Sequence, residues 1–322
     1  INGIPPPSFT EFLESTDWLN EPYDWETHTG ARPVMVKQGE EILKPNVREA
    51  ILICGSGSGK GWLSSRLATY MAVVYLHLKD PQRYYGFTEG DPIYIVNLAL
   101  NKDQAKNVIF AYIKACVERC EFLKKRAIHI GVNRIEFEKS LTIISGDSNF
   151  QGFYGYNILM GVLDELAFYD RVKKNDGTYV DYARDGWLAI NATKTHGNLK
   201  DFYKCVGITT AGPHDCFAEE YYDQIAEDAK DDQIKLSKYH ERLATWDVKP
   251  NITREDFDND FKLDYAHACA KYGAQKGFSG DSYYSSDEKE RFRDALNSGL
   301  SNIYIGSGRL DKSSIKPIPE AR

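Results

Sequence analysis

A short apolar run followed at once by a glycine-rich segment constrains the fold of this chain more than any other feature. The run, Ala50–Ile53, has the length and continuous apolarity of a strand that is buried on both faces. The segment after it reads Gly55-Ser56-Gly57-Ser58-Gly59-Lys60-Gly61. Apolar residues then recur at helical spacing from Trp62 to Leu78. We therefore expect a strand, a tight glycine loop and a helix in direct succession.

Strands and helices alternate along much of the remaining chain. We predict buried strands at Ile93–Val96, Asn157–Leu163 and Tyr203–Thr210, an antiparallel hairpin over Arg134–Ser145 at the edge of the sheet, and helices starting at Asn101 and lying around Trp187. The stretch 214–300 looks helical and polar, and 301–322 looks like a turn-rich tail. The alternation predicts an α/β fold with a mostly parallel sheet flanked by helices, followed by a small helical subdomain.

Composition excludes some functions. The 322 residues carry 40 Lys and Arg against 47 Asp and Glu, a net charge of -7, which excludes a blanket electrostatic grip on DNA or on an anionic membrane. The apolar stretches are too short to span a bilayer, so no membrane association is expected. The six cysteines form no CxxC pair, and we expect reduced, mostly buried thiols.

The glycine segment has what a phosphate-binding loop requires. Glycines permit the backbone angles that turn several N–H groups inward, the helix that follows presents its positive end, and Lys60 can reach phosphate oxygens. The match to G-x-x-x-x-G-K-[ST] is imperfect: Cys54 replaces the first glycine, and Gly61 replaces the hydroxyl residue that normally binds Mg²⁺. Ser64 or a water could substitute for that hydroxyl. The alternative is a Gly/Ser turn that merely precedes a helix.

Polar pairs end two of the other predicted strands. Asp164-Glu165 follows Asn157–Leu163; such an Asp can hold Mg²⁺ and such a Glu can act as a general base on water. Thr209-Thr210 ends the last strand, and its hydroxyls could contact a γ-phosphate. A solvated strand end and simple β-propensity are the respective alternatives. Because parallel strands end at one edge of a sheet, where ligands bind, we expect these pairs to meet the glycine loop.

The order of these motifs resembles the ATPase domain of the large terminase subunit of tailed bacteriophages. The resemblance spans roughly residues 8–290, and the stretches that carry it are 54–61, 93–107, 151–152 with 161–167, 207–213 and 244–250.

The resemblance implies an additional-strand P-loop ATPase that uses ATP and Mg²⁺. By position, residues 55–61 would bind phosphates, Lys60 would also be catalytic, Asp164 would hold Mg²⁺, Glu165 would be the catalytic carboxylate, and Thr209-Thr210 would couple hydrolysis to DNA movement. The implied partners are double-stranded DNA, the portal protein and the small terminase subunit, with the chain in a homo-oligomeric ring on the procapsid. The implied location is the cytoplasm of the infected bacterial host.

Four regions follow from this reading. We expect an N-terminal lead-in on the adenine side over 1–47, a P-loop core over 48–230, a lid over 231–300 and a tail over 301–322 that leads toward a nuclease domain absent from this chain. The loop lacks the arginine that family loops often carry near Ser56, so an activating arginine would come from elsewhere. Two other functions stay open: a helicase-like DNA remodelling ATPase, and a nucleotide-binding module in which Gly61 has impaired hydrolysis.

Overall fold

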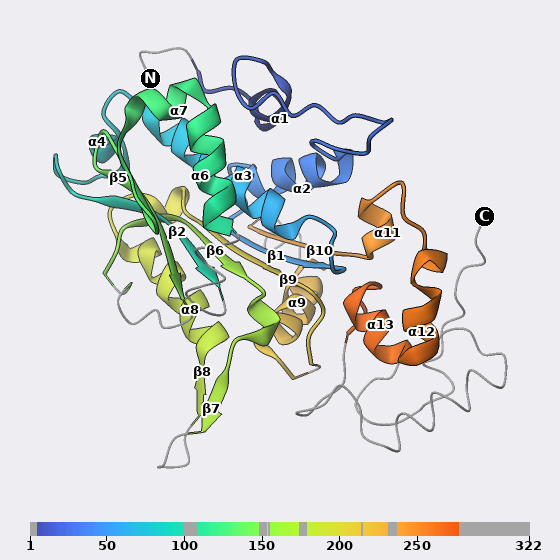
Figure 1. Cartoon of the computed structure of the whole chain (residues 1–322). Coiled ribbons are helices and arrows are strands. Elements are labelled where there is room, and N and C mark those ends of the chain that lie inside the picture. The colour runs from blue at the N-terminus through green and yellow to red at the C-terminus, as the bar shows by residue number, and fades with distance from the viewer. Residues whose placement is uncertain are drawn as a thin grey trace.

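An eight-stranded sheet organises the molecule, as seen in a computed structural model that describes residues 5–99, 109–147, 153, 155–173, 179–213, 215–230 and 237–276. The strands lie in the order β10-β1-β9-β6-β2-β5-β4-β3 (Figure 1). Their bounds are β1 Glu49–Cys54, β2 Ile93–Ala99, β3 Ala127–Ile130, β4 Arg134–Phe137, β5 Leu141–Asp147, β6 Ile158–Asp164, β9 Lys204–Thr209 and β10 Lys238–Leu243. The first six in that order, from β10 to β5, pair in parallel, and β4 and β3 add an antiparallel edge. The predicted α/β fold is confirmed.

Helices cover both faces of the sheet. The face under α3 carries most of the apolar core, and the opposite face packs on α8 and α9. The helices are α1 Phe9–Glu14, α2 Pro33–Leu43, α3 Lys60–His77, α4 Pro81–Tyr85, α6 Phe110–Arg119, α7 Glu121–Arg126, α8 Tyr182–Asn191, α9 Phe217–Asp228, α11 Thr245–Val248, α12 Asp258–Leu263 and α13 Tyr265–Lys271. Short 3₁₀ turns are η3 Leu166–Phe168, η4 Ala192–Thr195, η5 Leu199–Asp201 and η6 Arg254–Phe257. None of the helices in the described ranges is both long and apolar enough to cross a membrane.

Local sequence explains where the main helices begin. Pro33 opens α2, where its missing N–H is no loss, and the side chains of Asp80 and Asp181 accept backbone hydrogen bonds that cap α4 and α8. The helix α3 is buried on nearly every side, because α6, α1 and α2 cover the surface that the sheet does not. This explains why its apolar residues run almost all round the helix rather than along one stripe.

Two pairings differ from what the sequence predicts. The stretch 214–300 looked helical, but Lys238–Leu243 forms β10, which pairs in parallel with β1 and extends the sheet past residue 230, where we expected the core to end. Its sequence, KYHERL, is polar because every one of its residues is only half-buried at the sheet edge. A small hairpin, β7 Arg171–Lys173 with β8 Tyr179–Asp181, projects from the sheet in Figure 1 and is not among the predicted strands. The predicted helix start at Asn101 and the tail 301–322 lie outside the described residues.

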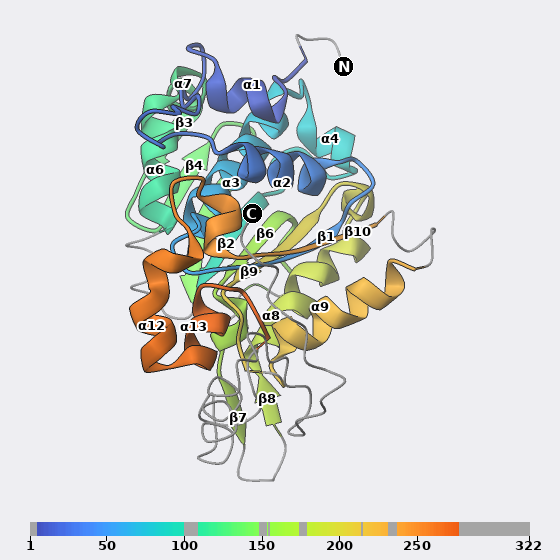
Figure 2. The same ribbon diagram turned by 90° about the vertical axis from the view of Figure 1, so that its right-hand side faces the viewer.

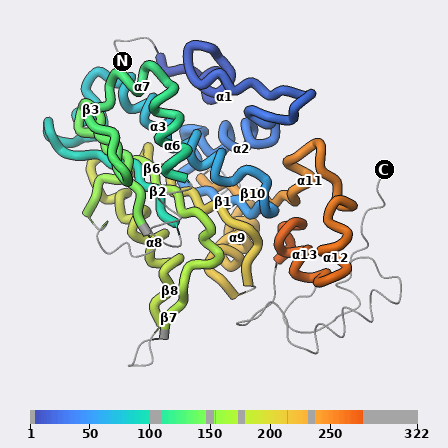
Figure 3. Tube along the Cα trace, in the orientation of Figure 1, coloured from blue at the N-terminus to red at the C-terminus, as the bar shows by residue number. Residues whose placement is uncertain are grey.

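The C-terminal helices α11 to α13 form a separate lobe at one end of the sheet. The tube in Figure 3 and the turned view in Figure 2 both place this lobe beside the end where β1 and β10 stop. An apolar cluster of its own, centred on Phe261, Tyr265 and Cys269, holds the lobe together. We call residues 244–276 the C-terminal lobe.

Candidate functional site: a P-loop facing an acidic strand end

The site is built where three parallel strands end side by side. Register places Cys54 of β1 beside the end of β9, because Ile53 pairs with Thr209, and places Asp164 of β6 opposite Ile208. The strand β9 therefore separates the strand of the glycine loop from the strand of the acidic pair. This additional strand between them brings all three predicted motifs to one edge of the sheet.

The glycine loop has the shape that the sequence predicts. The backbone runs from β1 into α3 with positive φ at Gly57 (74°) and Gly59 (103°), a region that side-chain-bearing residues rarely occupy. A Cβ on Gly59 would also lie 2.9 Å from Arg32 Nη1 and 3.1 Å from Met35 Sδ. Both glycines are thus required by the conformation itself. The loop ends at the N-terminus of an eighteen-residue helix, where backbone N–H groups lack intrahelical partners.

Lys60 lies between the loop and the acidic pair. Its side chain is buried, and its Nζ donates to the carbonyl oxygens of Cys54 at 3.3 Å and Gly55 at 3.4 Å. The same Nζ lies 3.7 Å from Glu165 Oε1. Residues that are more than a hundred positions apart in sequence, Lys60 and Glu165, therefore share one small space, as the predicted fold requires.

Glu165 is held by the threonine pair. Its Oε2 accepts hydrogen bonds from the Thr210 amide and from Thr210 Oγ1, both at 3.1 Å. Its backbone adopts the left-handed conformation with φ of 52°, which costs a non-glycine residue roughly 1 kcal/mol. Thr209 stabilises the turn after it, since its Oγ1 accepts from the Ala167 amide at 3.1 Å and donates to the Thr210 carbonyl at 2.9 Å. The carboxylate is thus oriented by contacts that the sequence alone did not reveal.

Asp164 is in a different electrostatic environment. Its side chain is buried, and burial raises the pKa of its carboxyl to about 7, with the charge of Glu165 adding to the shift and Lys60 opposing it. A buried carboxylate of this kind gains most from a cation close by. The adjacent acids thus differ: Glu165 is oriented by hydrogen bonds, whereas Asp164 is buried and Lys60 offsets the effect of burial on its pKa only in part.

The residues of the site fit a nucleotide with Mg²⁺. Ser58 Oγ, inside the glycine loop, is buried with no hydrogen-bond partner among the described residues, as expected of a hydroxyl that faces a ligand. Asp164 supplies a hard oxygen donor of the type that Mg²⁺ takes together with phosphate oxygens and water. No group of three or more His, Cys, Asp or Glu that could hold a metal occurs in the described ranges, so phosphate oxygens and waters would complete the coordination.

A lack of space does not explain why residue 61 is a glycine. A Cβ there would lie 3.7 Å from Ile109 Cγ1 and 3.9 Å from Tyr112 Cε2, which are ordinary contact distances. Ser64, the residue we considered as a substitute, is fully buried one helical turn further on, and its Oγ donates to the Lys60 carbonyl at 3.0 Å. The position of the usual Mg²⁺ hydroxyl is therefore open but bears no hydroxyl.

The C-terminal lobe contacts the glycine loop directly. The Ser56 amide donates to the Lys271 carbonyl at 2.6 Å, and Thr245 Oγ1 donates to the Ser56 carbonyl at 2.9 Å. The Thr245 amide in turn donates to the Tyr272 carbonyl at 2.8 Å. Sequence reasoning marked 244–250 only through its resemblance to a lid pattern. The backbone contacts could not be found, because a carbonyl carries no sequence signal.

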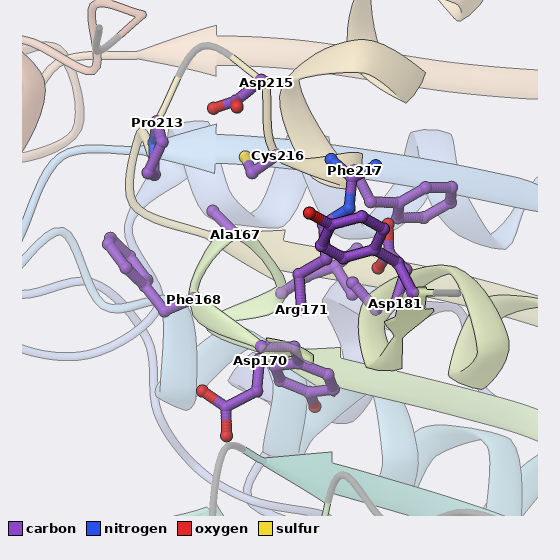
Figure 4. A pocket seen from close by; sticks show the side chains of 13 residues that line it. Ala167, Phe168, Asp170, Arg171, Asp181, Pro213, Asp215, Cys216 and Phe217 are labelled. Atoms are coloured by element: carbon purple, nitrogen blue, oxygen red, sulfur yellow. The ribbon is translucent and has the colours of Figure 1, made fainter. Parts of the chain in front are cut away.

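A cavity of about 670 Å³, shown in Figure 4, is lined from Leu166 onward by the residues that follow the acidic pair. Its walls are η3 with the residues up to Arg171, the strand β8 with the start of α8, and the residues Pro213, Asp215, Cys216 and Phe217. Neither the glycine loop nor Glu165 lines it. The cavity shares the backbone of Ala167 with the turn that Thr209 stabilises, so it adjoins the site without belonging to it.

The chain is similar to one curated protein and to several solved structures. An archaeal relative, the uncharacterized protein MJ0330 of Methanocaldococcus jannaschii, is 28% identical over 275 residues, which is 80% of this chain and 46% of that protein. The chain therefore spans about half the length of this curated relative. Among solved structures, the Thermus phage P74-26 large terminase ATPase domain is 16% identical with a TM-score of 0.49, over 73% of this chain and 91% of that one. The HK97 bacteriophage large terminase is 14% identical with a TM-score of 0.49, over 90% of this chain and 51% of that one.

The family match covers the described site from end to end. It runs over residues 34–274, from the first turn of α2 into the C-terminal lobe, and so includes the glycine loop, the acidic pair and the threonine pair. The chain belongs to the family described as the N-terminal P-loop domain of the uncharacterized protein MJ0330.

Proposed function

We propose that this chain hydrolyses ATP with Mg²⁺ as the motor domain of a terminase-type protein that moves double-stranded DNA into a viral procapsid. The observation that carries the hydrolytic part is the position of Glu165, hydrogen-bonded to Thr210 and 3.7 Å from Lys60 Nζ. The DNA-packaging part rests on the order of the sequence motifs, from the glycine loop through the acidic and threonine pairs to the 244–250 stretch.

Each residue of the site would have a separate role in hydrolysis. Lys60 and the N–H groups of the loop would bind the phosphates and offset their charge. Asp164 would hold Mg²⁺, which when bound neutralises charge on the transferring phosphoryl group. Glu165 would accept a proton from the attacking water, and its two hydrogen bonds from Thr210 fix its direction beforehand. Preorganisation of this kind lowers the barrier because the carboxylate need not be reoriented during the reaction.

A chain of contacts leads from the threonine pair to the C-terminal lobe. Beyond Thr210, the Gly212 amide donates to the buried carboxylate of Glu219 at 3.3 Å, and Glu219 Oε2 lies 2.5 Å from Arg242 Nη2. Arg242 Nη1 then donates to the carbonyl of Ala274 in the lobe at 2.7 Å. A change at Glu165 on hydrolysis would thus reach the lobe through packed, hydrogen-bonded groups, which is the physical link that a motor requires.

The partners follow from the same proposal. We infer that the chain holds double-stranded DNA transiently, since its net charge is -7, and that it works in a homo-oligomeric ring with a portal protein and a small terminase subunit. Its site of action would be the cytoplasm of an infected host cell. A neighbouring subunit in the ring could supply an activating arginine.

Steady-state release of phosphate, with and without double-stranded DNA, tests the hydrolytic part. We expect turnover by the parent chain and none by Glu165→Gln, with ATP binding retained, because the amide keeps the shape of the side chain but cannot accept the proton. Glu220→Gln is the matched control: Glu220 is an exposed carboxylate on α9, and turnover should be unchanged. Equal turnover by the parent and Glu165→Gln would refute the assignment.

One observation favours a second candidate, a module that binds nucleotide without hydrolysing it. Gly61 lacks the hydroxyl that helps to hold Mg²⁺ in P-loop enzymes. Binding of ATP by the parent with no turnover, even at high protein concentration with DNA and procapsids present, would support this candidate.

Movement along DNA is tested by displacement of a third strand from a DNA triplex, which reports translocation along a duplex. Separation of the duplex strands instead would indicate a helicase-like remodelling enzyme.

A further inference from the structure

Two cations from distant parts of the chain meet at the glycine loop. Arg32 immediately precedes α2, and its Nη1 donates to the Ser58 carbonyl at 3.5 Å. Lys249 immediately follows α11, and its Nζ lies 3.8 Å from where a Cβ on Gly57 would be. The loop thus has one cation on its α2 side and another on the side of the C-terminal lobe.

The contacts of each residue fix its place. Arg32 lies at the loop because Met35, one helical turn along α2, packs against Gly59. Lys249 lies at the loop because the helix before it is tied to the loop by Thr245, whose Oγ1 donates to the Ser56 carbonyl. Neither cation belongs to the loop motif, so its position depends on the tertiary fold.

Within the described part of the chain, no carboxylate forms an ion pair with either cation. The Nε of Arg32 is buried and has no hydrogen-bond partner there. Burial lowers the pKa of the Lys249 ammonium, and the positive charge of Arg32 lowers it further. The two like charges therefore repel each other, and an anion bound between them would attract both and offset this repulsion.

The loop itself offers an independent sign of a ligand. Ser58, the residue whose carbonyl Arg32 contacts, is about 1% exposed, and its hydroxyl has no partner in the described ranges. The first N–H groups of α3, which follow the loop and lack intrahelical partners, suit phosphate oxygens. The anion that the two cations lack is thus of the same chemical class that the loop is shaped to bind.

We propose that Arg32 and Lys249 form a clamp on the phosphate chain of the bound nucleotide, one cation from α2 and one from the C-terminal lobe. The clamp rests on the proposed function and deepens it: it supplies in the same subunit the positive charge that the loop lacks at Ser56, and it favours tri- and diphosphates over monophosphates. It also draws the lobe and α2 toward the same ligand, so that nucleotide binding closes the loop from both sides.

The test measures binding and stability, so it does not depend on turnover. The variants are Arg32→Gln, Lys249→Gln and the double variant, all made in Glu165→Gln so that ATP is not consumed. The ligands are MgATP, AMP, tripolyphosphate and a DNA duplex. Lys37→Gln on α2 and Lys262→Gln on α12 are matched controls, because both side chains are exposed on the same two parts of the chain.

Affinity for MgATP and for tripolyphosphate should fall about tenfold for each single variant, as expected for loss of one charge-assisted hydrogen bond. Affinity for AMP should change less than about twofold, on the same reasoning. Without ligand, each variant should melt at a higher temperature than its parent, because repulsion between the cations is relieved. A merely structural role would lower the melting temperature with and without ligand alike.

Three results would overturn the clamp: unchanged affinity for MgATP in the double variant, an equal loss of affinity for AMP and ATP, or weaker binding of the DNA duplex with ATP binding intact. These results differ from failure of the proposed function. A parent that binds ATP without hydrolysing it would refute the hydrolytic proposal and leave the clamp measurable.

Discussion

Removal of the Glu219 carboxylate is the most demanding test of the link between the sheet and the C-terminal lobe. The side chain of Glu219 is 0% exposed, and that of Arg242 is 21% exposed. Replacement by alanine leaves the Arg242 guanidinium without its counter-ion and the Gly212 amide without its acceptor. Loss of one partner of a buried ion pair costs about 3–5 kcal/mol, so we expect Glu219→Ala to lower the free energy of unfolding by about this amount.

The assay measures the free energy of unfolding in urea, with circular dichroism as the signal. Glu220→Ala is the matched control. Glu220 is the next residue on α9, but its ion pair with Arg184 is at the surface, where such pairs contribute about 0–1 kcal/mol. A decrease in the free energy of unfolding below about 1 kcal/mol for Glu219→Ala would refute the reasoning, because removal of a carboxylate buried beside a guanidinium is expected to destabilise the fold by more than this. In the double variant Glu219→Leu with Arg242→Met, stability should largely return, since apolar replacement of both partners leaves no charge unpaired.

Three further changes test the site and its surroundings. Gly61→Ser should lower the Mg²⁺ concentration needed for half-maximal ATP hydrolysis relative to Gly61→Ala, which controls for helix propensity; equal values would show that the hydroxyl has no role in this loop. Asn97→Leu should raise the free energy of unfolding by about 1–3 kcal/mol in urea titrations, because both amide atoms of Asn97 are buried without a partner in the described ranges; a loss would mean that they are satisfied. Burial lowers the pKa of Lys204 from 10.5 to about 7, so the unfolded chain binds the extra proton between these values and stability should rise with pH, by at most about 1.4 kcal/mol per pH unit. Urea unfolding at pH 7.5 and 9 should show this slope in the parent and a smaller one in Lys204→Met; the same slope in both would contradict the assignment.

The sequence predicted the parts of the fold that depend on local pattern. Continuous apolar runs identified β1, β2, β6 and β9, and the glycine loop fixed the connection from β1 to α3. The strand β10 was missed because an edge strand buries only half of each side chain and so can be built from polar residues. Its position beside β1 depends on pairing between distant segments, which a local stretch of sequence does not show.

The candidate site, like the fold, could be predicted only in part from the sequence. Lys60, Asp164, Glu165 and the threonine pair could be brought together in advance, because parallel strands end at one edge. The orientation of Glu165 by Thr210 could not, since it depends on a left-handed backbone at Glu165. The approach of Arg32 and Lys249 was also beyond prediction, because each is positioned by a helix whose packing is a property of the whole fold.

The hydrogen bond between the Ser56 amide and the Lys271 carbonyl gives this molecule a built-in reporter. A backbone amide exchanges its proton with solvent only when its hydrogen bond is broken, so the Ser56 amide can exchange only when the C-terminal lobe separates from the loop. The exchange rate of this one amide therefore reports how often the lobe separates from the loop, and it requires no label or substitution. Measured with and without nucleotide, that single rate would give the free energy with which the ligand holds the lobe shut.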